Sequence, residues 1–63
     1  MMNYIIWRDE NNKYELLIEV FNSSDVLSVQ KQFVNKGYIV TECFDTKGSS
    51  FIRCYKPNEE GDE

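Results

Sequence analysis

The segment Ser23 to Tyr38, SSDVLSVQKQFVNKGY, is the only part of the chain with helical periodicity, and it separates two strand-like halves. On a helical wheel its apolar side chains share one broad arc, which we expect to be the core face: Val26, Leu27, Val29, Phe33 and Val34. Gln30 interrupts this arc, so its amide either bonds the sheet backbone or meets a partner. The pattern predicts one amphipathic helix of about three turns.

Both ends of this helix carry capping signals. Residues 22–24, NSS, offer side-chain acceptors to the free amides of the first turn, and Asp25 suits the positive end of the helix dipole. Gly37 can take the left-handed conformation that closes a helix in a Schellman motif. In that motif the side chains of Phe33 and Tyr38 are brought together, so we expect their rings to touch.

Two strand pairs flank the helix, namely residues 2–8 with 13–21 and residues 38–44 with 50–56. The clearest alternation lies in residues 13–21, where we expect one set to face the helix: Tyr14, Leu16, Ile18 and Val20. In residues 38–44 the alternation does not say whether Val40 and Phe44 or their neighbours are buried. Pro57 has no amide donor and ends the last strand.

These elements predict an α+β fold with a β-β-α-β-β chain, in which a four-stranded antiparallel sheet has one helix packed on one face. With 63 residues the chain is near the lower limit for one domain, which we assign to residues 1–57. Those residues carry seven basic and seven acidic side chains, so the net charge of −4 comes from residues 58–63. We expect this end to be a disordered acidic tail.

The inventory of reactive side chains is poor. There is no histidine, and the two cysteines, Cys43 and Cys54, are too few and too far apart for a metal site. A turn near Thr46 would place Cys43 opposite Phe51 rather than Cys54, so we expect two buried thiols and no disulfide. The longest apolar run is too short for a membrane helix, and no basic leader precedes the first strand, so we expect a cytoplasmic protein.

One helix covers only one face of a sheet, and nine aromatic residues exceed what a one-sided core requires. Several apolar side chains are therefore left for the other face, where long basic side chains either cover them or leave them open to a partner. We take the second reading and assign a protein interface to five residues: Ile5, Trp7, Leu17, Phe21 and Tyr55.

The expected function is a small non-enzymatic module that binds another protein, either as a single chain or as a homodimer, without contacting a membrane. In size, plan and acidic tail the chain is similar to accessory proteins of phages and mobile elements, which bind and modulate a host protein. Catalysis is not expected, because Glu15 and Glu19 alternate with Leu17 as a solvated strand face does and no nucleophile has a base beside it. No cofactor is expected, since the chain has no ligand signature.

The alternative is a domain that binds single-stranded nucleic acid. Residues 47–54, KGSSFIRC, resemble the RNP1 segment of RNA-recognition motifs at Lys47, Gly48, Phe51 and Ile52, and depart from it at Ser49 and Cys54. The resemblance implies a binding surface made of Lys47, Phe51, Arg53 and Tyr55, with the aromatic rings stacking on bases. The body of the chain has no basic excess to attract phosphates, so nucleic acid is the less favoured partner.

Overall fold

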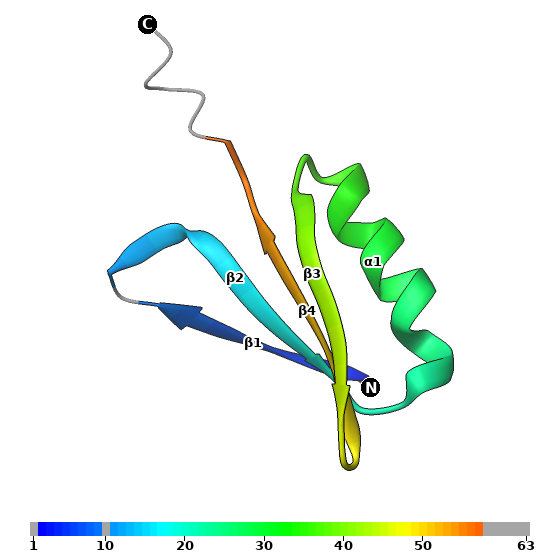
Figure 1. Ribbon diagram of the computed structural model, residues 1–63. Coiled ribbons are helices and arrows are strands. Elements are labelled where there is room, and N and C mark those ends of the chain that lie inside the picture. The colour runs from blue at the N-terminus through cyan, green and yellow to red at the C-terminus, as the bar shows by residue number, and fades with distance from the viewer. Residues whose placement is uncertain (1, 10, 58–63) are drawn as a thin grey trace, which may run out of the picture.

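The computed structural model describes residues 2–9 and 11–57, so the predicted acidic tail, residues 58–63, lies outside the described residues. The elements follow in the order β1 (Tyr4–Asp9), β2 (Asn12–Val20), the 3₁₀ turn η1 (Ser23–Asp25), α1 (Val26–Asn35), β3 (Ile39–Thr46) and β4 (Ser49–Tyr55) (Figure 1). Within these ranges no helix has the length and hydropathy needed to cross a membrane.

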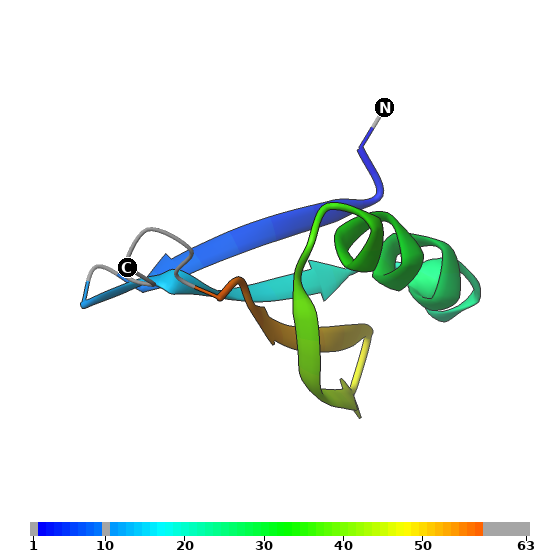
Figure 2. The same ribbon diagram turned by 90° about the horizontal axis from the view of Figure 1, so that it is seen from above.

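The four strands form one antiparallel sheet in the order β1-β2-β4-β3, which confirms the predicted α+β class and the β-β-α-β-β chain. Each hairpin contributes one central and one edge strand, and β2 pairs with β4 across the middle of the sheet. In both views the β1–β2 hairpin reaches away from α1, which lies at the other end of the molecule (Figure 1, Figure 2).

The core consists of alternate residues of the two central strands and two residues of α1. Its buried hydrophobic members are Leu16, Ile18 and Val20 of β2, Ile52 and Cys54 of β4, and Val29 and Phe33 of α1. The predicted buried set of β2 is confirmed for its last three members, while Tyr14 is half-buried. Tyr4 and Ile6 of β1 pack against the same cluster, so the alternation of both strands of the first hairpin is as predicted.

The buried arc of α1 is narrower than predicted. Leu27 is 71% exposed and Val34 is 49% exposed, so the expectation that both belong to the core face is wrong. On the wheel these residues lie about 100° to 120° from Phe33, whereas the contact stripe of a surface helix is itself about 100° wide. Val29 and Phe33 therefore belong to the buried cluster, Val26 packs against it, and Leu27 and Val34 stay in solvent.

The predicted caps are found at both ends of the helical segment. The side chain of Asn22 accepts a hydrogen bond from the amide of Ser24 at 3.1 Å and begins the 3₁₀ turn that precedes α1. At the other end the amide of Tyr38 donates to the carbonyl of Phe33 at 3.0 Å, and Gly37 has φ of 101°. The rings of Phe33 and Tyr38 meet edge to face, with centroids 5.6 Å apart, as the Schellman motif predicts.

A β-bulge in β3 resolves the ambiguous alternation of residues 38–44. Val40 pairs with Cys54 while Glu42 pairs with Arg53, so Thr41 is the extra residue. The hydroxyl of Thr41 donates to the carbonyl of Arg53 at 3.2 Å. Because the bulge reverses the alternation, Val40 packs against the core while Phe44, four residues later, pairs with Phe51.

Both cysteines are free thiols, and their burial differs. Cys54 is fully buried, as predicted, and burial raises the pKa of its thiol above the ordinary value. Cys43 is exposed, so the prediction of two buried thiols is wrong for this residue. It lies on the edge strand β3 after the bulge, opposite Ile52, and an edge strand has a neighbouring strand on one side only.

Candidate protein-binding face

The strand residues that alternate with the buried ones lie together on the opposite side of the sheet, which we call the second face. The strand register arranges them in three rows across the sheet: Trp7, Leu17, Arg53 and Glu42; Ile5, Glu19, Phe51 and Phe44; and Glu15, Tyr55 and Ile39. The first two rows cross all four strands. Residues far apart in the sequence are therefore direct neighbours on this face.

Large apolar side chains on the second face are open to solvent. Trp7 is 52% exposed, Ile39 is 45% exposed, Ile5 is 40% exposed and Tyr55 is 38% exposed. Leu17 is half-buried between Trp7 and Arg53 in its row. Exposed apolar residues that gather on one face, rather than lying singly, are typical of interaction sites.

A carboxylate fixes the orientation of the indole of Trp7. Trp7 Nε1 donates a hydrogen bond to Glu19 Oε1 at 3.1 Å, and the hydroxyl of Ser49 donates to Glu19 Oε2 at 2.9 Å. Glu19 thus connects the edge strand β1 to the start of β4. This arrangement leaves the polar atom of the indole occupied and about half of its surface free for contact.

Arg53 lies between two carboxylates on neighbouring strands. Its Nε donates to Glu42 Oε1 at 3.1 Å, and its guanidinium is 3.9 Å from Glu15 Oε2. Among the second-face side chains that the structure describes, the charged groups are the carboxylates of Glu15, Glu19 and Glu42 and the guanidinium of Arg53. An aromatic pair lies next to this group, since the rings of Phe44 and Phe51 are stacked with centroids 5.3 Å apart.

Four of the five residues predicted for the protein interface lie in the rows of the second face: Ile5, Trp7, Leu17 and Tyr55. The fifth, Phe21, follows the end of β2, where its amide donates to the carbonyl of Asn3 at 3.1 Å, and it lines a pocket at the end of the sheet. Of the residues assigned to the nucleic-acid alternative, Phe51, Arg53 and Tyr55 share the second face. Lys47 lies in the β3–β4 turn, at the opposite end of β4 from Tyr55.

Four residues of the second face were not predicted to bind a partner: Glu19, Ile39, Glu42 and Phe44. Glu19 belongs to the same alternating set as Leu17, so the strand pattern contained the signal that would have placed it there. Glu42 and Phe44 of β3 reach the second face through the bulge at Thr41, whereas Ile39 precedes the bulge and lies opposite Tyr55. Nothing in residues 38–44 marks that bulge, and it could not have been predicted from the local pattern.

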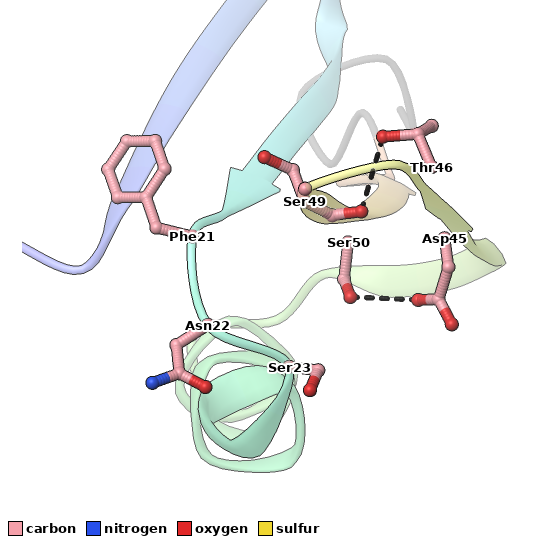
Figure 3. Close-up of a pocket in the computed structure, with 8 residues that line it drawn as sticks. Phe21, Asn22, Ser23, Asp45, Thr46, Ser49 and Ser50 are labelled. Carbon is pink, nitrogen blue, oxygen red and sulfur yellow. Dashed lines mark hydrogen bonds between the residues drawn. The ribbon is translucent and has the colours of Figure 1, made fainter.

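A pocket of about 360 Å³ lies where the β3–β4 turn approaches the connection between β2 and η1. Its lining is mostly polar, and Figure 3 shows the hydroxyl of Ser50 directed toward the carboxylate of Asp45. These two groups are 2.8 Å apart, and the hydroxyl of Thr46 donates to the carbonyl of Ser49 at 3.3 Å. The hydroxyls of Ser50 and Thr46 therefore bond to other lining residues, while the hydroxyl of Ser49 bonds to Glu19 outside the pocket.

Across residues 2–9 and 11–57, no group of three or more potential metal ligands converges. No protein-family model matches the chain, and neither a curated protein nor a solved structure gives a significant match. Within the described residues, the exposed apolar side chains of the second face are the feature that indicates a binding function.

Proposed function

We propose that the protein is a small non-enzymatic interaction module that binds another protein through the second face. The observation that carries the proposal is the set of exposed apolar side chains brought together on that face, Ile5, Trp7, Ile39 and Tyr55. Their polar neighbours already bond within the face, so the apolar groups are presented in fixed positions. A rigid aromatic anchor within a polar frame is the arrangement that protein interfaces favour.

In this proposal, α1 packs on the other face of the sheet. Val29 and Phe33 belong to one buried cluster with Ile18 and Ile52, and the Tyr4 ring meets the Phe33 ring edge to face at 5.7 Å. A single helix on that side leaves the second face for a partner.

The charges on the second face favour a protein partner over nucleic acid. Of the charged side chains described on this face, three are carboxylates and one is the guanidinium of Arg53, which is engaged by Glu15 and Glu42. A phosphate backbone would be repelled by this face, since affinity for nucleic acid comes mainly from unpaired basic side chains. The partner that this face suits presents apolar side chains together with lysine or arginine.

A role as an accessory protein that modulates its partner is part of this proposal. A module whose exposed apolar side chains share one face acts by occupying its target through that face. The proposal places this activity in the cytoplasm.

The test compares two double variants that each remove two exposed apolar side chains. Trp7→Ser with Tyr55→Ser alters the second face, and Leu27→Ser with Val34→Ser alters the outer side of α1. Wild-type protein is immobilised, the proteins that it captures from an extract of its source cells are identified, and the dissociation constant of each purified partner is measured with all three baits. Circular dichroism confirms that each bait is folded.

The proposal expects the second-face variant to bind the partner at least about a hundredfold more weakly, because each interface anchor is worth about 2 kcal/mol. The helix variant should bind with the wild-type constant. Equal affinity for the wild type and the second-face variant would place the binding site elsewhere and overturn the proposal.

A further inference from the structure

The outer edge of β1 is regular between Tyr4 and Arg8, where no other strand of the described residues pairs with it, and its register with β2 shifts only after Arg8, next to the hairpin turn. From Tyr4 to Arg8 it pairs with β2 without a register shift, and β1 is the last strand on its side of the sheet. Natural sheet edges are usually interrupted by a bulge, a proline or a lysine. The opposite edge follows this rule, because β3 has its bulge at Thr41. The sequence of β1, YIIWRD, has none of these devices between Tyr4 and Trp7.

The direction of the free backbone groups follows from one hydrogen bond. The amide of Phe21 donates to the carbonyl of Asn3 at 3.1 Å, and this pair continues the register in which Tyr4 lies opposite Val20. Hydrogen-bonded and non-bonded pairs alternate along an antiparallel ladder, so Asn3, Ile5 and Trp7 bond to β2. The N–H and C=O groups of the three remaining residues, Tyr4, Ile6 and Arg8, point outward from the sheet.

We propose that this edge binds β1 of a second copy of the chain, antiparallel and related by a two-fold axis at Ile6. In this register Ile6 lies opposite Ile6 of the second copy, Tyr4 opposite Arg8, and Ile5 opposite Trp7. The outward groups at positions 4, 6 and 8 are symmetric about Ile6, so every donor meets an acceptor in about six main-chain hydrogen bonds. The two sheets then become one continuous sheet.

The side chains suit this pairing on both sides of the sheet. On the second face, Ile5 of each copy packs against Trp7 of the other, which joins the exposed apolar surfaces of the two copies. On the core side, the Arg8 guanidinium lies opposite the Tyr4 ring, an attractive cation–aromatic pair. No like charges are directly opposed between positions 4 and 8 of the two strands.

The position of α1 leaves room for the second copy. Phe33 of α1 contacts the Tyr4 end of β1, while the other end of the β1–β2 hairpin lies away from α1 in both views (Figure 1, Figure 2). Antiparallel pairing places Tyr4 of one copy opposite Arg8 of the other. The helix of each copy therefore lies beside the turn end of the other hairpin.

Cysteine cross-linking tests the register. In a Cys43→Ser background, which removes the exposed thiol, Ile5→Cys and Trp7→Cys are prepared as separate variants. Directly opposed residues of a non-bonded pair have Cα atoms about 4.5 Å apart, within reach of a disulfide, whereas two copies of Ile5 would be separated by about 8 Å. A mixture of the two variants should form disulfide dimers at least about tenfold faster than either variant alone. A mixture of Ile39→Cys, on the opposite edge, with Trp7→Cys should not.

A backbone variant distinguishes association through the β1 edge from binding through the second face. Synthetic protein with an N-methyl group on the Ile6 amide keeps every side chain and loses an outward donor in each copy. The dissociation constant of the dimer, measured by sedimentation equilibrium, should rise at least about thirtyfold, equivalent to about 2 kcal/mol for two hydrogen bonds. Binding of a foreign protein to the second face does not use this amide, so the two proposals fail independently.

Three results would overturn the inference. The first is a wild-type mass of one chain at millimolar concentration, and the second is faster cross-linking of Ile5→Cys with itself than with Trp7→Cys. The third is a dimer whose dissociation constant is unchanged by N-methylation of Ile6, which would place the contact elsewhere, including on the second face. A wild-type mass of two chains together with the predicted cross-linking pattern would support it.

Discussion

Two valines on α1 provide a matched test of which side of the helix is packed. Val29 is fully buried and Val34 is 49% exposed, and they lie five residues apart on the same helix. Replacing each by alanine removes the same atoms and changes helix propensity by the same amount. Any difference between the two variants therefore reports burial.

The expected costs follow from the exposure of each side chain. At Val29, valine to alanine loses about 1.6 kcal/mol of transfer free energy for two carbon groups and about 1 kcal/mol for the cavity, and regains about 0.5 kcal/mol of helix propensity. The net loss is about 2 kcal/mol. At Val34 only about half of the transfer free energy is at stake and no cavity forms, so the net loss is about 0.3 kcal/mol.

The assay is urea unfolding at one fixed protein concentration, because association would add to the apparent stability. Far-ultraviolet circular dichroism and Trp7 fluorescence report the transition. With a slope of about 1 kcal/mol per M for a domain of this size, Val29→Ala should lower the midpoint by about 2 M and Val34→Ala by less than about 0.5 M. Equal shifts for the two variants would refute the assignment of Val29 to the core side and Val34 to solvent.

Three further predictions concern the thiols and the helix terminus. Cys43 should react with a thiol reagent in the folded protein at least about a hundredfold faster than Cys54, which should react only on unfolding; comparable rates would contradict the burial of Cys54. Burial raises the pKa of the Cys54 thiol above its ordinary value of 9.0, so the contribution of this thiol to stability is constant below pH 9.0 and is lost as the pH rises above it. In parallel denaturation curves, the stability advantage of the wild type over Cys54→Ala should therefore shrink above pH 9.0. Gly37→Ala should cost about 1 to 2 kcal/mol in urea unfolding, because the φ of 101° strains an L residue, and Gly37→Asn should cost less. A Cβ at this position would meet Lys56 Cε at an ordinary 3.5 Å, so the cost comes from the backbone. A neutral Gly37→Ala would show that the helix end readily changes conformation.

The features that were predicted correctly depend on residues close together in the chain. The Schellman motif needs a glycine after the helix and an apolar residue on either side of it, and Phe33, Gly37 and Tyr38 lie within six positions. The buried set of β2 follows from alternation within one strand, and the turn predicted near Thr46 joins β3 to β4, where Gly48 has φ of 99°. Steric limits on the backbone act locally, so these features can be read from short segments.

The predictions of which side chains of α1 and β3 are buried were partly wrong, because burial depends on which other elements pack against each side chain. An apolar residue on a helix is compatible with a wide or a narrow contact stripe, and the position of the sheet leaves Leu27 and Val34 in solvent. Cys43 is apolar enough for a core, but it lies on an edge strand after a bulge. The local sequence pattern around these residues is the same whether their side chains are buried or exposed.

The composition of the candidate site depends on long-range pairing. Arg53 meets Glu15 because β4 lies beside β2, and it meets Glu42 because the bulge at Thr41 shifts the register of β3. The sequence alone predicted the elements, their caps and which residues of β2 share a buried side, since these follow from local backbone and side-chain chemistry. Strand order, the bulge and the carboxylates around Arg53 were set by the folded sheet, because each depends on which distant segments pack together.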